Sequence, residues 1–576
     1  MTRQDGRTGR RDRLANRYAA WAARRLRVVT AFVAQPEPRS IGLHARGKQI
    51  LSGNILLAGH LAEAPGVPIW DITAPDPAFA AEAQGFIWLD DLVALGTPAA
   101  RKLAQDWTAR WIDRYGHGRG PGWTPDLTGR RMVRWIHHSV FLMSGQDKAA
   151  HDAWFAALAH QTEFLARRAR SAAPGLPRFE ALIGLLYAGL SLQGMDRHAG
   201  PAAESLAHDC ADLIDAEGGI ASRNPEELAE ILTLLGWAVR GLAEADRAIP
   251  RALSQAVDRI APCLRILRHA DGGLPRFHGG GTGAEGRLDQ ALSASAMPRP
   301  PGHAAMAMGY LRLSGGRTSV ILDAADPPAG PHRATAHAST GAFELTSGRR
   351  PLIVNCGSGL PFGAEWGLAG RATQSHSALA VNGFSSSRFG QNARSEMLEH
   401  CARVTALRQA GGDGALVWLA HDGWSATHGL SAARELHLSS DGRRLGGTDI
   451  LTAQSAAERA RFSELFDRSR LEGVGFALRF HLHPDVDATL DMGGTAVSMQ
   501  LRSGEIWVFR HDGKGRLSLD PSVYLEKGRL KPRPSRQIVL SCAARDFETR
   551  IGWTLAKAQD TPLAIRDLDR DDPVLL

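Results

Sequence analysis

Histidines in the second half of the chain have the type and spacing of a proton-transfer or metal site. His376 lies where the polar segment RATQSHSA runs into an alternating, strand-like segment. His481 and His483 occur in RFHLHPDV, and in an extended strand residues two apart point to the same face. Two imidazoles on one face, with a histidine or aspartate from a neighbouring strand, have the chemistry of a zinc site. The competing interpretation is that each imidazole is a satisfied structural group.

A second polar set lies in the first half of the chain, in WTPDLTGRRMVRWIHH. Trp123 and Trp135 could stack on a sugar ring, and Arg130 and Arg131 could hold a carboxylate through two parallel hydrogen bonds. The alternative is that Asp126 or Thr128 caps a helix and that the arginines are surface charge.

The segment GGIASRNPEEL has the signature of a helix start. Asn224 is in the N-cap position and Pro225 at the first helical position. Free backbone N–H groups at such a point bind anions readily, and Arg223 adds a positive charge. Simple capping explains the same residues.

Several catalytic signatures are absent from the sequence. No GxSxG, HExxH, P-loop or dinucleotide-binding fingerprint occurs, so no organic cofactor is expected. The five cysteines are widely spaced without a CxxC, which argues against a disulfide framework and a cysteine-based zinc site. The net charge of +8 suits an anionic partner. No lysine and arginine block has the form of a nucleic-acid patch, so nucleic acid is not an expected partner.

The N-terminal segment, residues 1–40, predicts a basic amphipathic helix. Residues 1–30 contain nine arginines and two acidic residues, without the uninterrupted apolar run of a signal peptide. Such a helix either packs on the body of the protein or attaches peripherally to an anionic membrane surface. On this basis the protein is cytoplasmic or membrane-associated.

Apolar residues recur at helical spacing through residues 41–315, from RKLAQDWTARWIDRYG to HAAMAMGYLRLSGG. Helices of this length without intervening strands favour an α/α toroid. After about Leu313 the pattern changes to short alternating runs separated by turn residues, which predicts an antiparallel β-sandwich over residues 316–576. The fold class is therefore a multidomain α and β protein. No apolar stretch reaches the length of a transmembrane helix.

Taken together, these motifs resemble the heparinase II/III family of polysaccharide lyases. The β-half carries the closest match, through NCGSG, RATQSHSALAVNGFSSSRFG, HDGW, RFHLHPDV and PSVY in that order. The helical half matches more loosely, through WTPDLTGRRMVRWI and GGIASRNPEEL. The resemblance covers roughly residues 40–560 and implies a toroid followed by a sandwich, with a cleft between them.

The resemblance also implies β-elimination on a polysaccharide that contains uronic acid. A neutralising group must stabilise the carboxylate as a base removes the C5 proton, and an acid must protonate the leaving oxygen. By position, His376 matches the family's histidine, a base or substrate contact, and Asn224 its neutralising asparagine. The matching residues for the family's structural zinc are His376, Asp422, His481 and His483. The implied basic groove would be lined by Trp123, Arg130, Arg131, Trp135, Arg223, Arg276 and Arg371.

The chain departs from the family at the catalytic tyrosine. None of its five tyrosines matches clearly; Tyr115, in RYGHGRG, is the most loop-like. His278, in RFHGGG, lies near the expected loop. Tyr115 and His278 are therefore the candidate proton donors.

Two functional hypotheses follow. The first is a lyase that cleaves an acidic glycan, with the cell envelope or periplasm as the location that the family implies. The alternative, favoured by the missing tyrosine, is a non-catalytic protein on the same scaffold that binds acidic glycan or serves envelope biogenesis.

Overall fold

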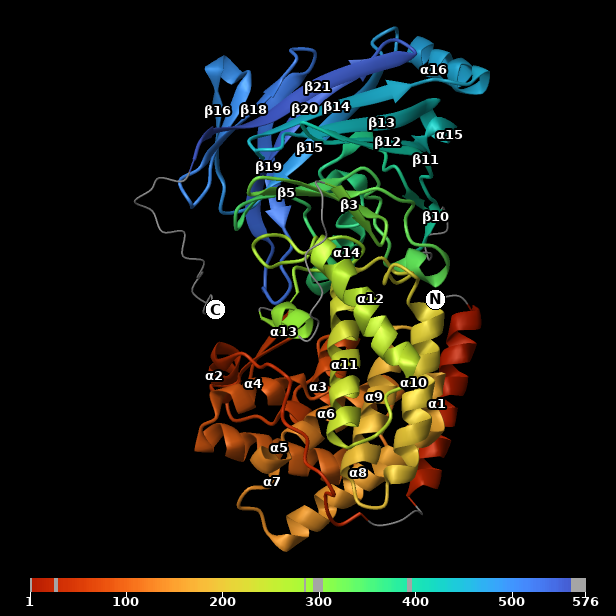
Figure 1. Ribbon diagram of the computed structural model, residues 1–576, viewed down its shortest axis with the longest axis vertical. Coiled ribbons are helices and arrows are strands. Elements are labelled where there is room, and N and C mark those ends of the chain that lie inside the picture. Colours follow the sequence, from red (N-terminus) through yellow and green to blue (C-terminus); the bar gives the residue numbers. More distant parts are fainter. Residues whose placement is uncertain (1–2, 25–28, 284–285, 294–303, 391–395, 561–576) are drawn as a thin grey trace.

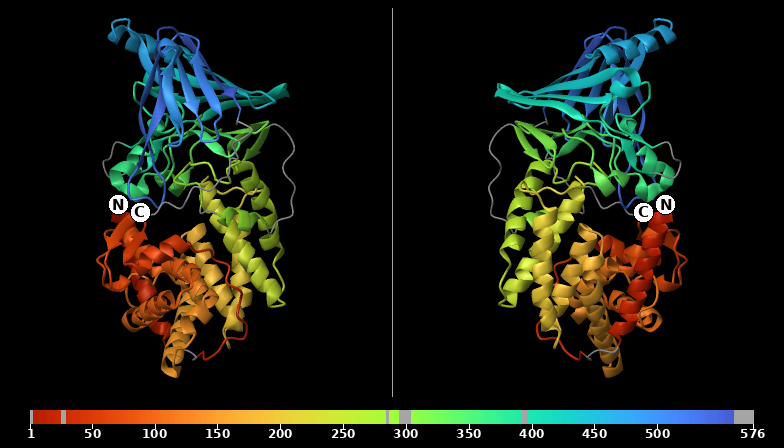
Figure 2. Two further views of the ribbon diagram at one scale, coloured as in Figure 1. Left: turned by 90° about the vertical axis from the view of Figure 1, so that its left-hand side faces the viewer. Right: turned by 90° about the vertical axis from the view of Figure 1, so that its right-hand side faces the viewer.

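The computed structural model describes residues 3–24, 29–283, 286–293, 304–390 and 396–560. A helical domain forms one end of the molecule and a β-domain the other (Figure 1). The two domains are stacked along the long axis (Figure 2). This arrangement confirms the predicted fold class, a helical first half followed by antiparallel sheets. Among the described residues, no helix is both long and apolar enough to cross a membrane.

The helical domain begins with α1 (Arg3–Ala23), which packs along α8. The remaining helices are α2 (His44–Leu51), α3 (Pro77–Gln84), α4 (Ile87–Leu95), α5 (Pro98–Tyr115), α6 (Pro125–His137), α7 (Ser139–Met143), α8 (Lys148–Arg168), α9 (Leu176–Ser191), α10 (Ala199–Leu213), α11 (Pro225–Glu244), α12 (Arg251–Leu267) and α13 (Arg287–Ser293). A small hairpin, β1 (Asn54–Leu57) and β2 (His60–Glu63), follows α2.

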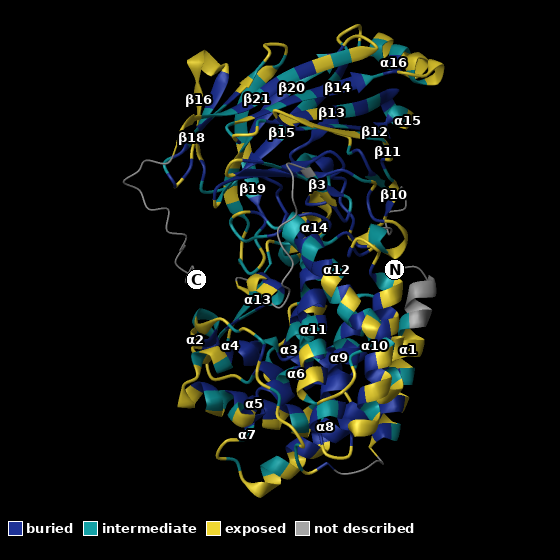
Figure 3. Cartoon of the chain, viewed as in Figure 1, coloured by how far each residue is buried: buried dark blue, intermediate teal, exposed yellow. Residues whose placement is uncertain are grey.

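Local sequence explains where these helices begin. Proline occupies the first turn of α3, α5, α6, α9 and α11, where its missing N–H costs nothing. Asp76 caps α3 by accepting from the Phe79 N–H at 2.7 Å. Helix α9 is apolar nearly all round and is buried along most of its length (Figure 3), as expected for an interior helix.

The β-domain contains two antiparallel sheets. The first has the order β19-β20-β15-β7-β6-β5-β4-β3, with β8 paired to β15, and the second the order β11-β12-β13-β14-β21-β18-β17-β16. The strands of the first sheet are β3 (Ala304–Ala307), β4 (Tyr310–Gly315), β5 (Thr318–Asp323), β6 (Phe343–Ser347), β7 (Arg350–Val354), β8 (Leu379–Val381), β15 (Val474–Leu482), β19 (Arg516–Tyr524) and β20 (Arg533–Ala544).

The strands of the second sheet are β11 (Val404–Gly412), β12 (Gly414–Trp424), β13 (Leu430–Leu438), β14 (Arg444–Thr452), β16 (Asp487–Asp491), β17 (Ala496–Gln500), β18 (Ile506–His511) and β21 (Glu548–Gln559). Outside the two sheets lie the pair β9 (Arg388–Phe389) and β10 (Leu398–His400) and the short helices α14 (Ala364–Ala369), α15 (Ser425–His428) and α16 (Ala456–Arg468).

Residues 304–315, within the segment HAAMAMGYLRLSGG predicted as the last helix, instead form the β3–β4 hairpin. Met308 and Gly309 both have positive φ, 49° and 76°, as a tight turn between two strands requires. The sheet therefore begins before the predicted boundary at residue 315. The hydrophobic core of the helical domain includes Tyr310 and Ile321 from this sheet, so the two domains share a continuous interior.

Candidate functional site

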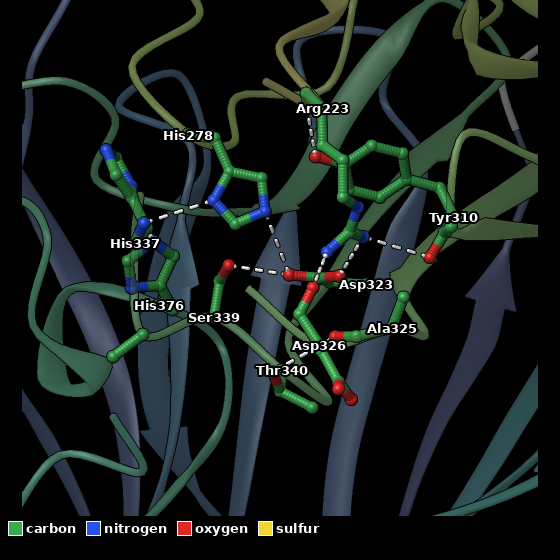
Figure 4. A network of polar contacts seen from close by, with 12 residues as sticks. Arg223, His278, Tyr310, Asp323, Ala325, Asp326, His337, Ser339, Thr340 and His376 are labelled. Carbon is green, nitrogen blue, oxygen red and sulfur yellow. Dashed lines mark hydrogen bonds and ion pairs between the residues drawn. The ribbon is translucent and has the colours of Figure 1, made fainter. Parts of the chain in front are cut away.

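A buried polar network lies where the loops of the two domains meet (Figure 4). The helical domain contributes Arg223, just before α11, and His278, in the loop between α12 and α13. The β-domain contributes Asp323 at the end of β5, His337 before β6 and His376 before β8. Each of these residues is at most 9% exposed.

Hydrogen bonds connect the three histidines in series, one through a backbone N–H and one between two imidazoles. The backbone N–H of His337 donates to His278 Nδ1 at 3.1 Å, and the backbone N–H of Gly279 donates to His337 Nε2 at 3.0 Å. Because His337 Nε2 accepts, the proton of His337 is on Nδ1, which donates to His376 Nε2 at 3.0 Å. His376 in turn directs Nδ1–H to the carbonyl of Ala372 at 2.7 Å. All three imidazoles are therefore neutral, and each lone-pair nitrogen is already an acceptor.

The far end of the network is an ion pair that ties the domains together. Arg223 lies 2.5 Å from Asp323 Oδ1 and donates to the carbonyls of Met308 at 3.0 Å and Asp326 at 2.6 Å. Its guanidinium stacks on the ring of Tyr310, whose hydroxyl donates back to the Arg223 carbonyl at 2.6 Å. All of these contacts are to the β-domain, so the prediction that Arg223 binds substrate is wrong. Arg223 instead anchors one domain on the other.

Burial determines the charge state of the histidines. It lowers the pKa of His278 and His337 well below the usual value. The Arg371 guanidinium lowers the pKa of both histidines further, and Arg223 lowers that of His278. Burial also lowers the pKa of His376, to about 4. Neutral imidazoles at pH 7 agree with the hydrogen-bond directions.

Asn224 lies beside this network and caps α11. Its Oδ1 accepts from the N–H groups of Glu226 at 3.0 Å and Glu227 at 3.2 Å. The loop that carries His278 passes so close that a Cβ at Gly280 would lie 2.6 Å from this oxygen. His278 itself has a positive φ of 47°, an uncommon conformation for a non-glycine residue. The structure thus places Asn224 next to the His278 loop, while its oxygen serves its own helix.

Several residues predicted to contact substrate lie elsewhere, inside the helical domain. Trp135 and Arg131 are fully buried, and Arg131 stacks on an indole ring and donates to Gln161 at 2.7 Å. Trp123 is 4% exposed and donates to the carbonyl of Tyr115 at 2.8 Å. As substrate contacts, Trp123, Arg131 and Trp135 are wrong in this conformation, because all three side chains are buried and the polar groups of Trp123 and Arg131 bond to protein partners.

Three further candidates, Tyr115, Arg130 and Arg371, also contact other protein groups. Tyr115 packs its ring against Trp70 and Trp111, and Arg130 pairs with Glu180 at 2.6 Å. Arg371 donates to three carbonyls, which occupies its guanidinium, so its prediction as a substrate contact is also wrong.

Arg276 differs from the other predicted arginines. It is 2% exposed and stacks on Tyr524 at 3.6 Å. Both terminal nitrogens lack a hydrogen-bond partner among the described residues.

The four predicted metal ligands do not fit a zinc ion. His481 uses both ring nitrogens, toward the Gln374 carbonyl at 2.9 Å and Ser522 Oγ at 2.7 Å. Asp422 accepts from the backbone N–H of Arg403 at 2.7 Å. In the part of the chain that the structure describes, no group of three or more histidine, cysteine, aspartate or glutamate side chains could hold a metal ion. His376, Asp422, His481 and His483 therefore do not act as one ligand set.

His337 is the central member of the network and is missed by the sequence argument. It lies in RATAHAST, between a strand and a polar loop, without a second histidine at strand spacing. The sequence offered one signal for His337, namely a histidine flanked by small residues just before a strand. Its partners come from residues 39 and 58–59 positions away, which no local pattern reveals.

Comparison with known proteins places the chain in a family. A family model described as heparinase II/III-like, C-terminal, matches residues 297–554. The FtsZ-localized protein C of Caulobacter vibrioides (strain NA1000 / CB15N) is 32% identical over 546 residues, which cover 91% of this chain and 89% of that protein. The chain belongs to the heparinase II/III-like family.

Solved structures extend the heparinase II/III-like likeness over both domains. Heparinase III matches with a TM-score of 0.68 and 12% identity, over 94% of this chain and 89% of that one. The heparan sulfate lyase HepC from Pedobacter heparinus matches with a TM-score of 0.54 and 14% identity, over 97% and 91%. A chondroitin AC lyase from Streptomyces coelicolor A3 matches with a TM-score of 0.51 and 13% identity, over 95% and 82%. At this identity the matches show that the chain has the fold of polysaccharide lyases.

Proposed function

We propose that this chain is an envelope-biogenesis protein that binds an acidic glycan on a lyase scaffold without cleaving it. The observation that carries the proposal is the set of three buried, neutral imidazoles whose lone pairs are all occupied. β-Elimination needs a base with a free lone pair and an acid beside the substrate's C5 and leaving oxygen. Here the lone pairs of His278, His337 and His376 accept hydrogen bonds from the protein itself.

Arginines at the domain junction support binding of an anionic glycan. Two adjoining cavities, about 950 Å³ and about 430 Å³, share Asp289 and Arg349 in their walls. Their lining arginines are Arg265, Arg268, Arg312, Arg317, Arg349, Arg350 and Arg502. Among the described residues, the acidic side chains that line the two cavities are Asp271, Asp289 and Asp485. One of the arginines, Arg268, lies 2.6 Å from Asp289. Guanidinium groups suit bidentate recognition of carboxylate or sulfate. We call this surface the arginine groove.

The relative from Caulobacter supports the assignment to envelope biogenesis, since its name states that it localises with FtsZ. We carry this association to the present chain as part of the proposal. The association with FtsZ favours a location at the membrane-associated division apparatus over a location outside the cell. The arginine-rich N-terminus agrees with this location.

Helix α1 supports a peripheral membrane contact. One face packs on α8, where Asn16 accepts from Arg168 at 2.7 Å. On its outer side Leu14, Tyr18 and Trp21 are 64%, 68% and 50% exposed, among exposed arginines. Apolar and aromatic side chains beside arginines are the composition of helices that lie on anionic lipid.

A lyase assay tests the central claim. We expect no unsaturated uronic acid, detected by ultraviolet absorbance, from a panel of acidic polysaccharides that an active control lyase degrades. Binding to at least one of these polymers should persist. Accumulation of unsaturated product that is abolished by His376→Ala would overturn the proposal and establish the lyase instead. The placement of Asn224 against the His278 loop is the observation that favours this second candidate.

A vesicle experiment tests the membrane contact separately. The full chain should co-sediment with vesicles that contain anionic phosphatidylglycerol and not with neutral phosphatidylcholine vesicles. Leu14→Glu with Trp21→Glu should abolish co-sedimentation, whereas Leu490→Glu, at an exposed position in the β-domain, should not. Equal sedimentation of both variants would contradict the assignment to α1.

A further inference from the structure

A separate cavity of about 630 Å³ lies beside the interdomain anchor. It is formed by the segment from the end of α10 to the start of α11, by the β3–β4 turn and by the segment after β5. Arg223 and Ala325, at the anchor end of the network in Figure 4, belong to its wall. We call this cavity the anchor pocket. Neither the histidine chain nor the arginine groove uses it.

The floor of the anchor pocket is apolar. Ile220, Met308, Pro327 and Pro328 are buried in its walls, and Met306 is 41% exposed at its edge. Methionine is flexible and polarisable, and it adapts to differently shaped apolar partners. An apolar floor with an exposed methionine is suited to a bulky side chain from a binding partner.

The rim of the anchor pocket is acidic, on a chain whose net charge is +8. Asp212, Asp215 and Glu217 are all exposed and line the same edge. The Arg223 guanidinium is committed to Asp323 and to backbone carbonyls, so it does not neutralise this rim. Arg259, which donates to the Asp215 carbonyl at 3.1 Å, is the neighbouring cation. The exposed His208 imidazole lies 3.1 Å from the Asp212 carboxylate. Three carboxylates beside one guanidinium and one imidazole favour a basic partner.

We propose that the anchor pocket docks a peptide segment of a protein partner, in which a bulky apolar side chain is flanked by arginine or lysine. The apolar side chain fills the floor, and the basic residues meet the acidic rim. The identity of that partner as a division protein rests on the proposed function, but the chemistry of the pocket does not.

Two alternatives fit the pocket less well. Small-molecule sites enclose most of the ligand's surface, whereas this pocket is bordered by exposed side chains, including Met306 and all three acids. An acidic glycan is repelled by the rim and is better accommodated by the arginine groove.

Fluorescence anisotropy with a labelled model peptide tests the proposal. The probe is the peptide Ser-Arg-Leu-Phe-Arg-Ser, and its counterpart with glutamate in place of arginine is the charge control. The full chain should bind the basic peptide and not the acidic one. Asp212→Lys with Glu217→Lys, and separately Met306→Asp, should each weaken binding by about tenfold or more, which corresponds to about 1.4 kcal/mol.

Matched variants at exposed positions outside the pocket are Glu204→Lys and Met492→Asp. These should bind the basic peptide like the unaltered chain, and circular dichroism should show that all variants are folded. Absence of binding to the unaltered chain, or equal binding by pocket and control variants, would overturn the proposal.

Co-sedimentation with FtsZ polymers separates this proposal from the proposed function. If the pocket variants lose co-sedimentation and the control variants keep it, both the pocket proposal and the FtsZ association are supported. If the pocket and control variants co-sediment alike, the FtsZ association stands and the pocket fails as its site. If the unaltered chain does not co-sediment but binds the basic peptide as expected, the pocket stands and the FtsZ association fails.

Discussion

The side chain of Arg223 shows how one residue can decide between two interpretations of the same motif. Its position before a helix suits anion binding, and its guanidinium instead enters the β-domain and pairs with Asp323. A buried charge is stable only when it is paired and hydrogen-bonded, and each polar contact of this guanidinium meets that requirement. The residue therefore contributes to domain cohesion.

Removing one partner of this pair should destabilise the protein strongly. We expect Arg223→Gln to lower the free energy of unfolding by about 3–5 kcal/mol, because it leaves Asp323 buried without its counter-charge. Urea denaturation measures the effect. The matched control is Arg550→Gln, which breaks an exposed pair with Glu548 and should cost under about 1 kcal/mol. Similar losses for both variants would contradict the anchoring role.

The neutral imidazole chain makes stability depend on pH. Burial lowers the folded-state pKa of His376 to about 4, below its unfolded value near 6.5, so the unfolded state binds more protons between these values. Stability is then fully present above pH ~6.5 and falls as pH decreases toward 4, by up to about 1.4 kcal/mol per pH unit for each such histidine.

Urea denaturation at pH 7.5 and pH 5.5 tests this dependence. His337→Gln, which breaks the chain at its centre, should reduce the pH dependence, whereas His208→Gln, at an exposed histidine, should not. An unchanged pH dependence in His337→Gln would contradict the assignment.

At the scale of elements, the cap of α11 and the glycine loop after His278 fit together. The loop can approach Asn224 because residue 280 lacks a side chain. The N-cap of α11 therefore constrains a loop that lies more than 50 residues away in the sequence. The same loop carries His278, whose Nδ1 accepts from the His337 N–H at 3.1 Å.

Gly280→Ala should disturb this contact. The added Cβ would lie 2.6 Å from Asn224 Oδ1, so we expect a loss of about 1 kcal/mol or more, comparable to the loss of an N-cap. Thermal denaturation followed by circular dichroism measures it. Gly281→Ala is the matched control, because its nearest neighbour is the flexible Lys527 side chain at 3.3 Å. A larger effect at residue 281 than at residue 280 would count against this account.

At the scale of the whole molecule, the junction has two chemically different surfaces. The arginine groove lies between α12–α13 and the first sheet, and the anchor pocket lies between the α10–α11 segment and the β3–β4 turn. One is basic and the other is acidic at its rim. This arrangement would let the proposed glycan and the proposed protein partner bind at the same time.

Charge reversal in the groove should weaken glycan binding. Arg349 is exposed and is shared by both groove cavities. We expect Arg349→Glu to lower the affinity for an acidic polysaccharide by roughly tenfold at low salt, and by less at high salt because screening shortens the reach of exposed charges. Affinity electrophoresis at two ionic strengths measures the change. Arg550→Glu, away from the groove, should leave binding unaltered.

The order of helices and then strands was predictable from the sequence, because hydrophobic periodicity is local and differs between the two element types. The cap formed by Asn224 was predictable for the same reason. The β3–β4 hairpin was not, since its apolar residues fit either period and only pairing within the sheet decides between them. The His278–His337–His376 chain, the commitment of Arg223 to Asp323 and the burial of Trp135 were also decided by tertiary structure. Each depends on residues from different domains or distant helices that meet only after folding, and burial then determines their charge and accessibility.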